Sequence, residues 1–158
     1  MLFPFFQWCD STALANVMKN SPWAFAVVES VHLLGLSVIG GAVLLVNMRL
    51  LGLGFRDHPV AEIAHDAYPW LVGALIVMLV SGVPLFLAET TKCYYSFPFW
   101  VKMTSLLLSI TFTFTLWRRV IFADEPRVGP LWRRAAALVS LALWFGVGGA
   151  GRWIGFSG

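Results

Sequence analysis

The fold is decided by the stretch PWAFAVVESVHLLGL, residues 22–36, which continues as an apolar run to Arg49. A transmembrane helix needs about 20 predominantly apolar residues, so this run is long enough to cross a bilayer. Two titratable residues, Glu29 and His32, interrupt it. Because a charge in hydrocarbon costs about 2.5–3.5 kcal/mol on insertion scales, such residues mark a candidate functional site.

Composition places the whole chain in the same class. Of its 158 residues, 59% are hydrophobic and only 12% are charged, and the mean hydropathy is +0.78. A soluble domain carries about 25% charged residues, so we predict one integral membrane domain over residues 1–158, with the lipid bilayer as its immediate partner. The net charge of +3 comes without a basic patch interleaved with aromatic residues outside the spans, so no nucleic-acid partner is expected.

Three further apolar runs follow, separated by Gly, Pro and charged residues. The sequence therefore predicts an all-α, four-transmembrane-helix bundle with spans at about 22–48, 67–88, 99–117 and 135–154. Ahead of the first span, Ser11 is expected to cap a short interfacial helix over about residues 12–20. The alternative for this segment is a disordered tail.

Tryptophan residues are expected at the ends of the spans, because their amphipathic rings collect at the level of the lipid headgroups. Trp144 is placed in the middle of a span. The following fall at predicted span ends: Trp23, Trp70, Trp100, Trp117, Trp132 and Trp153.

The distribution of Lys and Arg predicts the orientation. The loops after the first and third spans carry Arg49, Arg56, Arg118, Arg119, Arg127, Arg133 and Arg134, whereas the opposite side carries Lys19, Lys92, Lys102 and Arg152. Since the excess of basic residues faces the cytoplasm, we expect a multi-pass protein of the bacterial inner membrane with both termini in the periplasm.

This orientation puts both cysteines, Cys9 and Cys93, on the oxidising side of the membrane. Two cysteines in such a compartment favour a disulfide, here tying the N-terminal segment to the loop between the second and third spans. The alternative is two unrelated thiols near the membrane surface.

Glu29 and His32 stand three residues apart, so they share a helix face. Polar residues on such a face are expected to turn toward the bundle interior rather than lipid. His32 would then ligate haem b, with Met78, Met103, a water or a group from another protomer as the second axial ligand. Copper would instead use His32 and Glu29, with Met103 as a soft third donor.

Two other interpretations need no cofactor. The pair is either a packing device, satisfied by Lys102 or by a threonine of the third span, or a path for protons or ions. Lys102 and Arg152 lie near the outer ends of their spans, where each either extends to the membrane surface or pairs with Glu29.

Several short motifs occur along the chain in a specific order: ESVHLLGL at 29–36, RLLG at 49–52, PW at 69–70, SG at 81–82, FWVKM at 99–103 and GRWIGF at 151–156. With these motifs the chain resembles a bacterial family of uncharacterised four-helix integral membrane proteins. The architecture is distantly similar to CopD-type copper-resistance and cytochrome b561-like bundles, a resemblance that implies metal or haem handling.

This chain departs from the family's pattern in two places. Asn47-Met48 precedes Arg49 where the relatives carry an Asp, and residues 111–117 lack the Asn and the His that the relatives carry late in the third span. If that second His is the partner of His32, its loss favours a specialised or structural role.

The leading prediction is a membrane module that binds haem b or copper for redox chemistry or metal handling, with His32 as ligand and Glu29 as second ligand or proton partner. The alternatives are a non-catalytic accessory subunit of a larger membrane complex, which needs no cofactor, and a small proton or ion conductor. Gly-rich helix faces favour a homo-oligomer or a complex. No nucleophile triad, phosphate loop or CxxC motif is present, so the sequence does not predict an enzyme.

Overall fold

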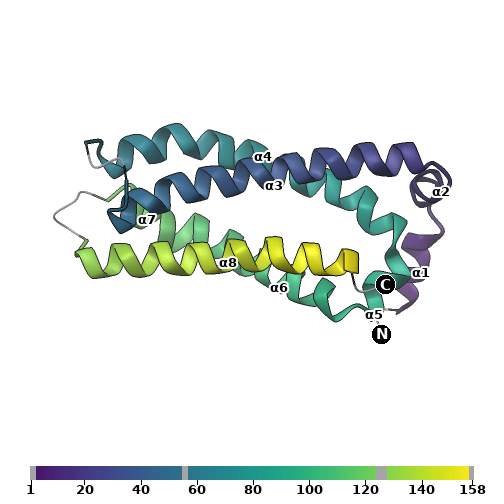
Figure 1. Ribbon diagram of the computed structural model, residues 1–158. Helices are drawn as coiled ribbons and strands as arrows, with labels where there is room; N and C mark the ends of the chain where they lie inside the picture. Colours follow the sequence, from purple (N-terminus) through teal and green to yellow (C-terminus); the bar gives the residue numbers. More distant parts are fainter. Residues whose placement is uncertain (1–2, 55–56, 124–127, 157–158) are drawn as a thin grey trace.

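The chain folds into helices that run back and forth along one long axis (Figure 1). The computed structural model describes residues 3–54, 57–123 and 128–156, and no strand occurs in those ranges. The helices are α1 Phe3–Asp10, α2 Ala13–Asn20, α3 Pro22–Leu51, α4 Val60–Ala88, α5 Thr90–Tyr95, α6 Phe97–Phe112, the π-helical η1 Thr113–Trp117, α7 Arg118–Ile121 and α8 Pro130–Phe156.

Four stretches are long and apolar enough to cross a membrane: Pro22–Leu51, Val60–Ala88, Phe97–Ile121 and Pro130–Ile154. The predicted all-α fold with four spans is thereby confirmed, and the chain is a multi-pass membrane protein. α4 begins at Val60, because the polar residues 60–66 are helical and lead into the second span, as the sequence predicts. α8 begins at Pro130, earlier than the predicted start of the fourth span at about residue 135, in a stretch with Arg133 and Arg134 that hydropathy assigns to a loop. Arg56 and Arg127 of the predicted cytoplasmic loops lie outside the described residues.

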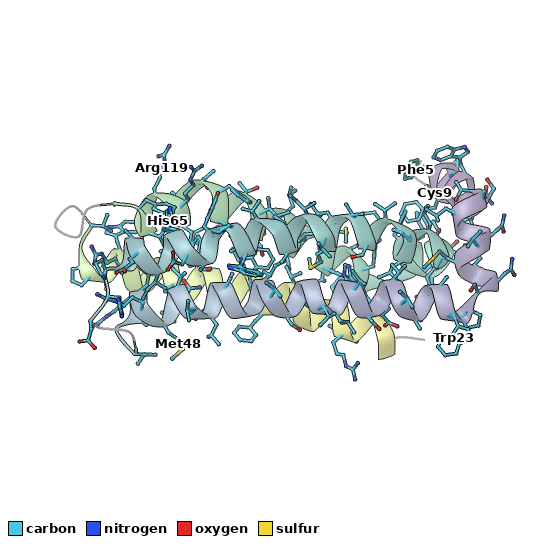
Figure 2. All side chains as sticks on the ribbon, turned by 90° about the horizontal axis from the view of Figure 1, so that it is seen from above. Phe5, Cys9, Trp23, Met48, His65 and Arg119 are labelled. Carbon is cyan, nitrogen blue, oxygen red and sulfur yellow. The ribbon has the colours of Figure 1, made fainter. Side chains whose placement is uncertain are left out.

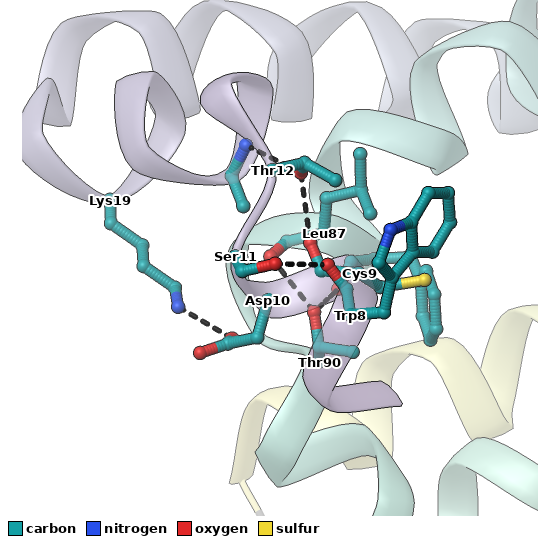
Figure 3. Close-up of polar contacts among 10 residues, drawn as sticks. Trp8, Cys9, Asp10, Ser11, Thr12, Lys19, Leu87 and Thr90 are labelled. Carbon is teal, nitrogen blue, oxygen red and sulfur yellow. Dashed lines mark hydrogen bonds and ion pairs between the residues drawn. The ribbon is translucent and has the colours of Figure 1, made fainter. Parts of the chain in front are cut away.

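The N-terminal segment forms two short helices instead of the single one predicted. The Thr12 hydroxyl accepts from the Ala15 amide at 3.3 Å and so caps α2. The predicted cap, Ser11, instead donates its hydroxyl to the Trp8 carbonyl at 2.7 Å, at the end of α1 (Figure 3). Both helices lie across the end of the bundle at which α3 begins (Figure 1).

The spans pack as two pairs, α3 with α4 and α6 with α8, and α3 also packs against α8. Gly35 allows α3 and α4 to approach closely, because a Cβ at this position would lie 3.3 Å from the Ala74 carbonyl oxygen. The apolar core between the helices includes Ile39, Val43 and Leu71, which are fully buried.

A smaller aromatic cluster holds α1 against the bundle. Phe6 of α1 packs edge-on against Phe86 of α4 and Tyr94 of α5, with ring centroids 5.4 and 5.1 Å apart. Phe86 in turn stacks on Phe99 of α6 at 5.7 Å. Since each aromatic pair contributes about 0.5–1.5 kcal/mol beyond its buried area, the Phe6 contacts fix α1 to α4 and α5, and Phe86 extends the cluster to α6.

The tryptophans test the predicted span ends. Five of the residues predicted there are exposed, namely Trp23, Trp70, Trp100, Trp132 and Trp153. The prediction is wrong for Trp117, which is only 1% exposed. The helix continues past Trp117 into α7, and the indole hydrogen-bonds inside the bundle.

Candidate functional site

His32 lies half-buried on α3, and its ring is held against α4. Its Nδ1 is 3.0 Å from the Ser81 hydroxyl oxygen, and that hydroxyl donates to the Val77 carbonyl at 2.7 Å. Because a serine hydroxyl has one proton, already given to Val77, we assign Nδ1 of His32 as the donor and Nε2 as the nitrogen with the lone pair. Gly82 makes room for the ring, since a Cβ there would lie 3.4 Å from His32 Cε1.

Lys102 is a second basic residue in the same half of the bundle. It lies half-buried on α6, and its Nζ would be 3.6 Å from a Cβ added at Gly151 of α8. The side chain therefore occupies the space that Gly151 leaves on α8. Lys102 and Glu29, both within the described part of the chain, form no ion pair. Arg152 lies on the exposed side of α8 near its end.

Glu29 does not face the bundle interior, so that expectation is wrong. Its side chain is exposed, whereas His32, three residues later, is half-buried. Three residues of α-helix turn about 300°, which leaves the two side chains roughly 60° apart. The edge of the buried face of α3 falls between them.

The predicted ligands Glu29, His32 and Met103 are not brought together. Met103 is exposed on α6, next to the half-buried Lys102. Met78, by contrast, is buried on α4. Among the described residues, no group of three or more His, Cys, Asp or Glu side chains could hold a metal ion.

Cys9 and Cys93 are both buried as free thiols, so the predicted disulfide is not formed in the structure. Cys9 lies on α1 and Cys93 on α5, two helices that pack against each other. Burial, and then the nearby Glu89 carboxylate, raises the pKa of Cys93 to about 11. The thiol is therefore neutral and a poor nucleophile at neutral pH.

A buried polar network in the other half of the bundle involves residues that were not among the predicted site residues. Asn47 of α3 is fully buried; its Nδ2 donates to the Ser140 hydroxyl of α8 at 3.0 Å. Its Oδ1 accepts from the Trp117 indole of η1 at 2.9 Å. A second indole, Trp144 of α8, donates to the Thr113 hydroxyl of η1 at 3.2 Å. These bonds tie α3, η1 and α8 together where the third span becomes π-helical, a feature frequent at functional sites.

The outer face of α3 carries a row of small side chains, here called the small-residue face: Ala26, Ser30, Ser37, Gly40 and Gly41, all exposed. The Ser30 and Ser37 hydroxyls donate to carbonyls of their own helix at 2.8 and 2.9 Å. A Cβ added at Gly40 or Gly41 would meet no heavy atom within 4 Å. Gly35 of the same helix, by contrast, faces α4, because a Cβ there would lie 3.3 Å from the Ala74 carbonyl oxygen.

Taken together, the apolar spans and their packing define an all-helical, four-span integral membrane protein (Figure 2). Residues 5–157 match the family described as "Family of unknown function (DUF6644)", and the chain belongs to that family. No curated protein and no solved structure matched the chain, so the similarity to CopD-type and cytochrome b561-like bundles stays a prediction.

Proposed function

We propose that this protein is a non-catalytic assembly subunit of a membrane complex, which binds a transmembrane helix of another subunit through the small-residue face of α3. The observation that carries the proposal is Glu29, a carboxylic acid exposed on a span beside that face. Small residues let two helix backbones approach closely, and polar side chains then form hydrogen bonds between the helices.

The Glu29 side chain is energetically unfavourable at its depth in the bilayer unless another group pairs with it. It is residue 29 of a helix that begins at residue 22, which is roughly 10 Å along the helix axis. Its side chain forms no hydrogen bond or ion pair with the described residues. An acidic residue inside a bilayer typically pairs with another group or faces a protein interior. A partner helix would supply a group that pairs with Glu29 and a protein surface that shields it from lipid.

The charge of Glu29 also indicates what kind of helix binds. Two copies that met symmetrically through this face would bring two Glu29 carboxylates together, because a two-fold contact uses the same patch on both subunits. Like charges at short range repel. A helix of a different subunit, with small residues and a Lys, Arg or hydrogen-bond donor at the depth of Glu29, fits better.

The proposal is tested by measuring the complex in native membranes. Tagged wild type, Gly41→Leu, Glu29→Leu and Gly73→Leu are extracted in mild detergent, sized by native electrophoresis and analysed by mass spectrometry. Gly73 is the matched control, because it is exposed on α4 and, like Gly41, has open space around an added Cβ.

We expect the wild type to migrate above its 17.5 kDa chain mass with a second polypeptide, and Gly41→Leu to lose that polypeptide. Glu29→Leu should lower association about five- to thirtyfold, since interhelical hydrogen bonds contribute about 1–2 kcal/mol in model peptides. Gly73→Leu should behave as wild type. A monomeric wild type, a complex built only from this chain, or equal loss in Gly41→Leu and Gly73→Leu would each reject the proposal.

Cofactor binding is a second proposal, because the His32 geometry favours it. Its Nδ1 is held by Ser81, an arrangement that leaves Nε2 to ligate haem iron or copper and orients the ring. Met78, buried on the same helix as Ser81, is a better candidate than Met103 for a soft second ligand.

An absorption spectrum and a metal analysis of the purified protein test this second proposal. A Soret band, or stoichiometric copper, that is lost in His32→Ala and kept in Glu29→Ala and Met103→Leu would support it. Colourless, metal-free protein from haem- and copper-supplemented cells would exclude it, without affecting the assembly proposal.

A further inference from the structure

A pocket with two arginines lies at the end of the third span, where η1 continues into α7. Its volume is about 410 Å³, and it is lined by Phe114, Thr115, Arg118, Arg119 and Phe122. We infer that this pocket binds the headgroup of an anionic phospholipid, with the two guanidinium groups on the phosphate and the phenyl rings against the acyl chains. The inference does not depend on the proposed assembly role.

Contacts with α4 hold one side of the pocket in place. Tyr68 of α4 packs edge-on against Phe114 and Phe122, with ring centroids 6.1 and 6.0 Å apart. The central carbon of the Arg118 guanidinium lies 5.6 Å from the centroid of the same tyrosine ring. Tyr68 therefore restrains both phenyl rings and one guanidinium before a ligand arrives, which lowers the entropy cost of binding.

The positive charge of the pocket is not balanced by the residues that the structure describes. The Tyr68 ring has no net charge, so its contact with Arg118 leaves the guanidinium charge in place. Arg119 is exposed and extends away from the helices (Figure 2). Among the described residues, neither arginine side chain forms an ion pair or a hydrogen bond, and no lining residue is acidic. A phosphate between the two guanidinium groups would be attracted by both.

Position and lining together indicate a lipid rather than a soluble phosphate. Both arginines lie in the last turn of the apolar stretch Phe97–Ile121. Trp70, two residues after Tyr68 on α4, is exposed, and exposed indole rings collect at the level of the lipid headgroups. Basic residues at this level attract anionic headgroups, whose phosphate a guanidinium binds in a bidentate manner. The phenyl rings offer apolar contact to acyl chains, which a soluble phosphate does not have.

The test counts bound lipids by native mass spectrometry of the purified full-length protein in detergent. The protein is titrated with phosphatidylglycerol or with phosphatidylcholine of the same acyl chains, and glycerol 3-phosphate is added as a competitor without acyl chains. The variant is Arg119→Gln, whose side chain is exposed and has no partner among the described residues, so the fold tolerates its loss. The matched control is Arg134→Gln, which removes an equal charge from an exposed arginine of α8 outside this pocket.

We expect phosphatidylglycerol to bind more tightly than phosphatidylcholine and to be displaced by glycerol 3-phosphate only at a large excess. Arg119→Gln should weaken phosphatidylglycerol binding about fivefold, the factor expected for one basic residue near an anionic surface, while Arg134→Gln keeps it. Equal binding of the two lipids, no weakening in Arg119→Gln, equal weakening in both variants, or displacement of the lipid by equimolar glycerol 3-phosphate would each overturn the inference.

Discussion

Asn47 uses both ends of its amide to join three helices, and it does so where water cannot replace either bond. Asn47→Leu would leave the Trp117 indole and the Ser140 hydroxyl without their partner. A buried polar group left unsatisfied costs about 1–3 kcal/mol, so we expect the variant to unfold more easily by about that amount. Unfolding in detergent and denaturant, followed by tryptophan fluorescence, measures the change.

Ser109→Ala is the control for Asn47→Leu. Ser109 is equally buried, but its hydroxyl donates to the Ser105 carbonyl of its own helix at 2.7 Å and joins no other span. Its loss should change the free energy of unfolding by much less. Equal effects of the two substitutions would mean that the Asn47 network does not hold the helices together.

Cys93 gives the protein a pH dependence at the alkaline end. Its pKa is about 11 in the folded chain against a model-peptide value of 9.0, mainly because burial disfavours the thiolate. The neutral thiol therefore supports folding fully below pH 9, and this contribution is lost as pH rises to about 11. Thermal melting at pH 8 and pH 11 should show a smaller drop for Cys93→Ala than for the wild type. Identical drops would contradict the assignment.

The sequence predicted which residues were polar within the spans, but not which way each one faced. His32 and Glu29 fit one helix face equally well by spacing, and only the position of α4 against Gly35 decides that His32 turns inward. Trp144 was visible as an unusual mid-span residue, and Asn47 as a polar residue near the end of the first span. Their partners lie on other helices, however, so no local pattern could identify them.

Among the helices, the α3–α4 contact depends on the absence of a side chain at Gly35. A Leu at this position would meet the Ala74 carbonyl and the Met78 amide, which are backbone atoms and cannot turn away. Overpacking costs typically about 1–3 kcal/mol, so Gly35→Leu should lower the melting temperature of the protein in detergent.

Gly40→Leu is the matched control for Gly35→Leu, because it adds the same side chain to the same helix in open space. It should leave the melting temperature unchanged or raise it, since Gly is a poor helix former by about 1 kcal/mol relative to Ala. The reverse order of the two melting temperatures would rule out the α3–α4 packing described above.

The apolar runs predicted the four spans well, because a bilayer imposes the length of a helix directly. The first turns of α8 and the π-helical η1 were missed, because they follow from tertiary contacts. Thr113 and Trp117, at the two ends of η1, both hydrogen-bond with residues of other helices. A π-helical turn changes the direction in which each of these two side chains points, and hydropathy carries no information about that direction.

For the whole molecule, the arginine distribution predicts that both termini lie on the outer side of the membrane. A C-terminal fusion to alkaline phosphatase should be active, and the same fusion after Leu53 should be inactive. Fluorescent-protein fusions at the same positions should give the opposite pattern. An inactive C-terminal phosphatase with a fluorescent C-terminal fusion would reverse the predicted orientation.

The attachment of α1 has a consequence for biosynthesis. Phe6 leaves the ribosome early, yet Tyr94 and Phe99, which complete its aromatic cluster, follow only after two spans have been made. Contacts between such distant parts of a chain form late. The N-terminal segment must therefore wait during translation until two spans and the beginning of the third have been made.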